Sequence, residues 1–141
     1  MAPTLTERPH GKTKGMAFHR WLRHLLPALL LAWSTLSAAT PSAEEHVVIQ
    51  TLIQRIEKMT SMTFVRNGDA HTSAEAAQHM QAKYAYFKDK ITTAEDFIEL
   101  CASRSAMTGK AYWVKMGDAA PVEANAFLKK ELRAVRGLPT P

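Results

Sequence analysis

The chain of 141 residues has room for one domain, and its 46% hydrophobic content is ordinary for a globular protein. Its net charge of +5 is concentrated at the start: residues 1–39 carry five basic and one acidic side chain (5 − 1 = +4), and the remaining residues carry 13 and 12 (13 − 12 = +1). A nucleic-acid-binding domain needs a basic surface. The weak charge of the main part of the chain therefore argues against nucleic acid as a partner.

Residues 1–39 have the pattern of a secretory signal peptide. A basic segment precedes an apolar run from Leu25 to Leu36, and residues 37–39 supply the small side chains that a signal peptidase needs. The apolar run is shorter than the roughly 20 residues of a membrane-spanning helix, although a retained anchor is the alternative interpretation. We therefore expect cleavage after Ala39, a periplasmic or secreted protein, and no stable membrane span once the leader is removed.

Residues 40–137 are expected to form a single compact domain, followed by a short tail at residues 138–141. A first helix is indicated over residues 44–59, where apolar side chains recur three and four positions apart. Two acids, Glu44 and Glu45, suit its N-terminus because the helix dipole favours negative charge there.

Residues 63–84 predict a short extended run, a tight turn and an amphipathic helix. Phe64 and Val65 favour extended backbone, and Asn67-Gly68 favours a turn because both residues tolerate positive φ. Thr72 can cap the helix, with Glu75 completing a capping box, which leaves His71 in the turn. The apolar face of this helix would consist of Ala76, Ala77, Met80, Tyr84 and Phe87.

A third helix is expected after the polar break at residues 88–91. Thr92 and Thr93 are both candidate N-caps, because each has an acid three positions later. Residues 103–110 are rich in turn formers, and residues 111–116 form a β-prone run. A last helix is expected from Pro121, since proline is tolerated at the first helical position, to its end at Gly137.

The fold prediction follows from the two β-prone runs, near Phe64 and Tyr112. A lone strand would leave its backbone polar groups unpaired, so the two runs should pair with each other. We therefore predict a mainly α domain of the α+β class. It would have about four helices on one side of a minimal two-stranded antiparallel ribbon.

Four short motifs occur in an order and spacing that resemble a known family. They are Phe64-Val-Arg-Asn-Gly68, Ala76-Ala-x-His-x-x-x-Lys83, Thr93-Ala-Glu-Asp-Phe-Ile98 and Ser103-x-Ser-x-x-Thr-Gly-Lys-x-Tyr112. Over residues 46–116 the chain resembles the YfeK-like family, small exported bacterial proteins that carry a domain of unknown function. The resemblance implies an envelope location and a shared compact domain. It implies no reaction, ligand or catalytic residue.

Two patterns suggest sites but are better explained structurally. His71, Glu75 and His79 lie four positions apart and would share a face of a continuous helix, as metal ligands can. Because His71 is placed in the turn and Glu75 in a capping box, we predict no metal ion and no other cofactor. Cys101 is the only cysteine, so it cannot form an intrachain disulfide, and we assign it to the core.

The turn from Ser103 to Thr108 holds the hydroxyl groups that a small hydrolase could use, with His79 or His71 as base. No Gly-x-Ser-x-Gly elbow is present, and Thr108-Gly-Lys110 lacks the other residues of a phosphate loop. We interpret these hydroxyls as partners of the helix end and assign no catalytic residue. A small hydrolase that uses His79 and this turn is the alternative function.

Basic residues at the strand ends give the most specific hypothesis. If the two runs pair, their cations could gather beside free turn N–H groups and hold a carboxylate or phosphate. The predicted ligand-binding residues are Arg66, Asn67, Arg104, Lys110 and Tyr112. The preferred function is a non-enzymatic envelope protein that binds another protein, a cell-wall fragment or a small anion.

Overall fold

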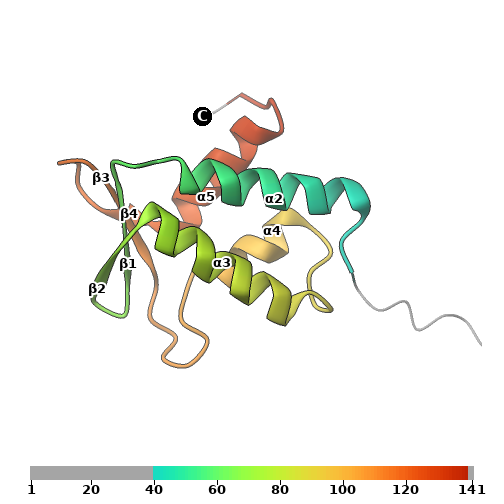
Figure 1. Cartoon of the computed structure of the whole chain (residues 1–141), viewed down its shortest axis with the longest axis horizontal. Helices are drawn as coiled ribbons and strands as arrows, with labels where there is room; N and C mark the ends of the chain where they lie inside the picture. Colours follow the sequence, from blue (N-terminus) through green and yellow to red (C-terminus); the bar gives the residue numbers. More distant parts are fainter. Residues whose placement is uncertain (1–39, 140–141) are drawn as a thin grey trace, which may run out of the picture. The chain divides into compact units, whose positions relative to one another are not determined.

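The computed structural model describes residues 40–139, so the predicted leader, its cleavage site and the last two residues lie outside the described part. The described residues form a mixed α+β fold with four helices and a four-stranded antiparallel sheet (Figure 1). No helix in this range is long and apolar enough to cross a membrane. The elements are α2 (Ala43–Glu57), β1 (Met62–Arg66), β2 (Asp69–Thr72), α3 (Ser73–Phe87), α4 (Ala94–Phe97), η1 (Ile98–Ala102), β3 (Trp113–Met116), β4 (Val122–Glu123) and α5 (Ala124–Val135).

Side-chain caps define where the helices begin. The Ser42 hydroxyl accepts the Glu45 N–H at the start of α2, and Thr72 forms the predicted capping box with Glu75 at the start of α3. Of the two threonines proposed for the third helix, Thr93 is the N-cap of α4. These caps satisfy N–H groups that have no partner within their helices.

The third helix widens at its end from α4 into the π-helical turn η1. Ser103 follows this turn, and its hydroxyl donates a 2.6 Å hydrogen bond to the Ile98 carbonyl oxygen. Asn125 of α5 donates in turn to the Ser103 oxygen at 2.7 Å. Ser103 therefore closes the helix end and links it to α5, as expected for a structural hydroxyl.

The predicted pairing of the two β-prone runs is confirmed, with Phe64 opposite Val114 and Val65 opposite Trp113 in antiparallel register. The predicted two-stranded ribbon is wrong in extent, because the sheet has four strands in the order β2-β1-β3-β4. Tyr112 is buried and Trp113 is 40% exposed, so these neighbours face opposite sides of the sheet, as successive residues of extended backbone do.

Strand β2 was interpreted as a turn, with His71 in it. Instead, the two-residue turn at Asn67 and Gly68 sends the chain straight back along β1, so that His71 pairs with Phe64. Asn67 has φ of 55° and Gly68 has φ of 100°, the positive values that a tight hairpin of this kind requires.

Strand β4 was interpreted as the first turn of the last helix. Val122 and Glu123 pair with Val114 and Trp113, and helix α5 begins only at Ala124. Pro121 therefore precedes an edge strand rather than opening a helix, a position where its missing N–H is equally harmless. The predicted helix end is confirmed at Gly137, whose φ is 67°.

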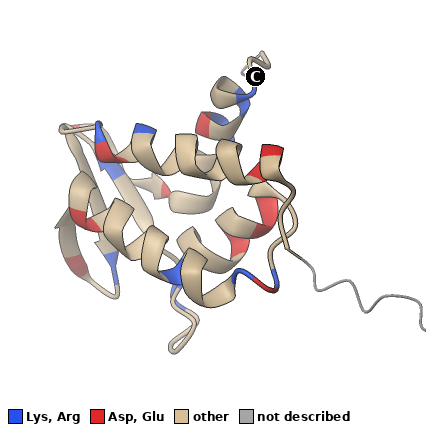
Figure 2. Ribbon diagram, turned by 45° about the vertical axis from the view of Figure 1, so that its right-hand side comes forward, with Lys and Arg blue, Asp and Glu red and all other residues tan. Residues whose placement is uncertain are grey.

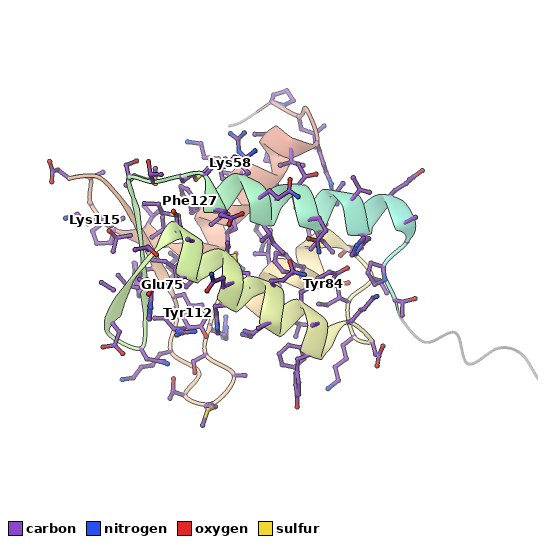
Figure 3. All side chains as sticks on the ribbon, viewed as in Figure 1. Lys58, Glu75, Tyr84, Tyr112, Lys115 and Phe127 are labelled. Atoms are coloured by element: carbon purple, nitrogen blue, oxygen red, sulfur yellow. The ribbon has the colours of Figure 1, made fainter. Side chains whose placement is uncertain are left out.

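The core lies between the helices and the inner face of the sheet. Helices α2 and α3 run side by side, and the strands lie at one end of them (Figure 1). Tyr84 of α3 packs edge-on against Phe97 of α4, with 5.6 Å between ring centroids (Figure 3). Cys101 is fully buried, as predicted.

Candidate functional site

Three segments meet beside the sheet and enclose a pocket of about 390 Å³. They are the end of β1 with its turn, the second half of α3, and the loop of residues 103–112. We call this hollow the Arg66 pocket. Its lining includes Arg66, Asn67, His79, Lys83, Ser105 and Tyr112.

The 103–112 loop is itself a small hairpin. Its two arms are joined by backbone hydrogen bonds from Tyr112 N–H to the Ser103 oxygen and from Ser105 N–H to the Lys110 oxygen, each 2.9 Å. At its tip the Thr108 hydroxyl donates to the Asn67 side-chain oxygen at 3.1 Å. The loop is therefore fastened to the β1–β2 turn, which fixes two walls of the pocket relative to each other.

Arg66, His79 and Tyr112 form the polar floor of the pocket. The Arg66 guanidinium lies 2.5 Å from His79 Nδ1, and the other ring nitrogen, Nε2, lies 3.5 Å from the Tyr112 hydroxyl. Tyr112 lies at the sheet side of α3 (Figure 3). Its ring also packs edge-on against Phe64. The floor is thus built from β1, from α3 and from the residue that leads into β3.

The contact with Arg66 determines the protonation of His79. A guanidinium can only donate, so Nδ1 must be the acceptor and carry no proton. Burial, followed by the positive charges of Arg66 and Lys83, lowers the pKa of His79 to about 4. His79 is therefore neutral near pH 7, with its proton on Nε2, on the side of Tyr112.

Lys83 supplies a second cation, one helical turn beyond His79. Its ammonium donates to the Arg104 carbonyl oxygen at 3.1 Å and lies 5.5 Å from the centre of the Tyr112 ring. Burial is the main reason that the pKa of Lys83 is lowered. The ammonium is therefore held over the pocket by a neutral oxygen and an aromatic face.

Neither cation of the pocket forms an ion pair with a described side chain. Four ion pairs occur within residues 40–139, and neither Arg66 nor Lys83 takes part in any of them. Asp69 also lines the pocket, at an exposed position. Two partly desolvated cations thus share one concave site without a bound acid, which is an arrangement that attracts an anion.

The structure brings three of the five predicted ligand residues together. Arg66, Asn67 and Tyr112 line the Arg66 pocket. Lys110 instead lines a neighbouring hollow that it shares with Asn67 and Trp113. The Arg104 side chain lines neither hollow, and only its backbone oxygen contributes, through Lys83.

Sequence reasoning missed Lys83 as a site residue and considered His79 only as a metal ligand or a base. The signal that could have found them is their spacing. His79 and Lys83 are four residues apart, so on one helix they share a face, and both belong to the motif Ala76-Ala-x-His-x-x-x-Lys83. What the sequence could not give is the packing of that face against Arg66.

The other candidate groups serve the fold. The Glu75 carboxylate accepts from the Thr72 N–H at 2.8 Å in its capping box, and His71 lies in β2. Within residues 40–139 no three metal-ligating side chains are grouped to hold an ion. Burial raises the pKa of Cys101 to about 12, so its thiol is not activated as a nucleophile.

Residues 43–136 match the Family of unknown function (DUF5329). The chain belongs to this family. It is also 37% identical over 92 residues to the Uncharacterized protein YfeK of Salmonella typhimurium (strain LT2), an alignment that covers 64% of this chain and 77% of that protein.

The expected relationship to YfeK-like proteins is thereby confirmed over most of the described domain. No solved structure matches the chain significantly. These similarities identify the family and assign no activity to it.

Proposed function

We propose that this protein is a non-enzymatic binding module of the bacterial envelope, and that the Arg66 pocket binds an anionic group. The observation that supports the proposal is the pair of unneutralised cations, Arg66 and Lys83, held in one hollow. A carboxylate or phosphate would form charge-assisted hydrogen bonds with both cations.

The Arg66 guanidinium is oriented for this task. One of its terminal nitrogens is fixed by His79, which leaves its other N–H groups for a ligand. Because His79 is neutral, it orients the guanidinium without cancelling its charge. An orienting partner that preserves charge favours recognition of an anion, since less side-chain entropy is lost on binding.

We favour binding over the small hydrolase for two reasons. A neutral histidine offers one basic nitrogen, and on His79 that nitrogen already accepts from Arg66. Within residues 40–139 no hydrogen bond joins a serine or threonine hydroxyl to a histidine, whereas the Ser103 and Ser105 oxygens are engaged by Asn125 and by the Thr108 N–H.

The envelope location rests on the leader-like pattern of residues 1–39. Intact-mass measurement on protein recovered from the native envelope tests it directly. We expect the mass of a chain that begins at Thr40. A mass that still includes Leu25–Leu36 would contradict cleavage and favour a retained anchor.

Anion binding is tested by thermal melting of the protein with phosphate or acetate, against chloride at matched ionic strength. A ligand that binds the folded state alone raises the melting temperature. We expect this rise in the wild type and its loss in Arg66→Met. Arg66→Lys should reduce it, because an ammonium cannot reproduce the planar fork of the guanidinium.

Arg104→Gln is the matched control, since it removes a nearby cation whose side chain does not line the pocket. It should melt like the wild type with and without the anion. If Arg104→Gln and Arg66→Met reduce the anion effect equally, the response reflects general positive charge and the proposed pocket is wrong.

A further inference from the structure

The rim of the Arg66 pocket is apolar and unusually exposed. Tyr86, from the end of α3, is 81% exposed, and Met107, at the tip of the 103–112 loop, is 96% exposed. Within residues 40–139 these are the two most exposed large hydrophobic side chains, and both line this same pocket. Single exposed apolar residues are common on protein surfaces, but two from different segments that line one hollow form a local surface for binding.

A third apolar side chain, Phe87, lies between the rim and the interior of the pocket. Phe87 also lines the pocket, its ring packed edge-on against Tyr86 with 4.8 Å between centroids. The Lys83 ammonium lies 5.8 Å from the centre of the Phe87 ring. An apolar wall therefore leads directly to the Lys83 ammonium, so that a ligand could contact both at once.

The charges of the pocket indicate how many negative charges the ligand carries. Arg66 and Lys83 contribute two positive charges, the exposed Asp69 contributes one negative charge, and His79 is neutral. The sum is one positive charge (2 − 1 = +1). A single carboxylate matches this sum, and phosphate with two negative charges should bind more weakly because Asp69 repels it more strongly.

We infer that the Arg66 pocket binds a carboxylate attached to an apolar group. Arg66 and Lys83 hold the carboxylate at the floor, while Tyr86, Phe87 and Met107 cover the apolar part. This inference rests on the proposed anion site and names its ligand class. The volume of about 390 Å³ suits a small organic acid or the last residue of a peptide.

The flexible side chain of Met107 and the rigid ring of Tyr86 both suit such a rim. Methionine adapts to ligands of different shape, and an aromatic ring supplies contact area with little loss of conformational entropy. The hydrogen bond between Thr108 and Asn67 fixes the loop that carries Met107, so the rim is held over the floor in the free protein.

The test is calorimetric titration of the protein with three matched ligands. These are acetate, 3-phenylpropionate and its uncharged amide. Burying the phenyl group should make 3-phenylpropionate bind about tenfold more tightly than acetate. The amide should bind at least about tenfold more weakly than the acid, because it lacks the charge that Arg66 recognises.

Variants of the rim distinguish its contribution from that of the floor. Tyr86→Ser and Met107→Ser should each weaken 3-phenylpropionate about threefold to tenfold and leave acetate unchanged. Both side chains are exposed, so these variants should fold normally. Val47→Ser is the matched control, because Val47 is 62% exposed on α2 and does not line the pocket. It should change neither affinity.

A fourth ligand, N-acetylglycylphenylalanine, distinguishes a free acid from a peptide terminus. Tighter binding than that of 3-phenylpropionate would identify a peptide terminus as the source of the carboxylate, and weaker binding would identify a free acid.

Equal affinities for acetate and 3-phenylpropionate would overturn the apolar part of the ligand class and would leave the anion site unaffected. Equal affinities for the acid and its amide would overturn the anion site itself, and no binding of any ligand would overturn both.

Discussion

Within residues 40–139 two arginines are partly buried, in very different surroundings. Arg136, at the end of α5, hydrogen-bonds two carboxylates, with its Nη2 lying 3.0 Å from both Glu45 Oε1 and Glu95 Oε2. Arg66 contacts a neutral histidine and no carboxylate within residues 40–139. We call the first set, Arg136 with Glu45 and Glu95, the acidic clasp.

The acidic clasp joins the ends of three helices. Glu45 lies in the first turn of α2 and Glu95 in the first turn of α4, where the helix dipoles favour negative charge, and Arg136 caps the C-terminus of α5. Figure 2 shows acidic residues where α2 and α4 begin. Glu45 also accepts the Ala94 N–H at 2.6 Å, so its carboxylate serves two helices.

The comparison separates a structural charge from a charge held for a ligand. In the acidic clasp each charge is satisfied within the protein, and hydrogen bonds to Arg136 hold the pKa of Glu95 below its usual value. In the Arg66 pocket positive charges accumulate and only the exposed Asp69 opposes them. Stability accounts for the first arrangement but not for the second, because grouped cations repel each other.

The sharpest test replaces each arginine by methionine in the free protein. Arg136→Met leaves two carboxylates without their partner, and we expect about 2 kcal/mol less stability, below the buried-pair value because the clasp is partly exposed. Arg66→Met relieves repulsion with Lys83 and should stay within about 0.5 kcal/mol of the wild type. Urea denaturation of both variants without added anion measures the difference.

The contrast between the two arginines would break down if Arg66→Met destabilised the free protein as strongly as Arg136→Met. The Arg66 contact would then be structural. Glu95→Gln provides an internal check on the clasp, because it keeps hydrogen-bonding capacity but removes one charge. It should cost about 1 kcal/mol or less, since the Glu95 side chain is 48% exposed.

A second test uses pH, because the two regions titrate in different ranges. The pKa of His79 is about 4 in the folded protein and 6.5 in an unfolded chain. Between these values the unfolded state binds more protons, so the folded state loses stability as the pH falls. The lowered pKa of Glu95 gives stability that is lost only below its unfolded value of 4.5.

We expect the wild type to lose about 1.5 kcal/mol more than His79→Gln between about pH 7 and about pH 4.5, a value reduced for partial exposure. The glutamine oxygen can still accept from Arg66, so this variant removes the titration and keeps the contact. Urea denaturation at both pH values measures the effect. His71→Gln, outside the pocket, should behave as the wild type, and parallel curves for all three proteins would contradict the assignment to His79.

The sequence was sufficient where local chemistry decides the structure. Thr72 with Glu75, Asn67-Gly68, and Gly137 each act through their immediate neighbours, and each was predicted correctly. Strands β2 and β4 were missed because they are only four and two residues long, and their side chains are mostly exposed. Their strand conformation comes from pairing with β1 and β3, and local sequence patterns do not reveal that pairing.

The site shows the same division. Arg66, Asn67 and Tyr112 were proposed because they flank the β-prone runs, and they do line one pocket. Lys83 was missed because its role depends on how α3 packs against the sheet and the 103–112 loop. Tyr86 and Met107 could not be identified from sequence, since nothing in the local pattern distinguishes an exposed apolar residue at a pocket rim from one elsewhere on the surface.

The smallest expected effect concerns how the pocket is held together. Thr108→Val removes the hydroxyl that donates to Asn67 and keeps a side chain of similar shape. The bond is exposed, so its loss should lower stability by only about 0.5 kcal/mol.

The Thr108→Val substitution also frees the loop that carries Met107. Ordering that loop on binding should weaken the affinity for 3-phenylpropionate about threefold. Within residues 40–139 no hydrogen bond or ion pair joins the acidic clasp to this loop, so the stability lost in Arg136→Met and in Thr108→Val should add in the double variant. A tighter complex after Thr108→Val would mean that the loop obstructs the pocket instead of forming its wall.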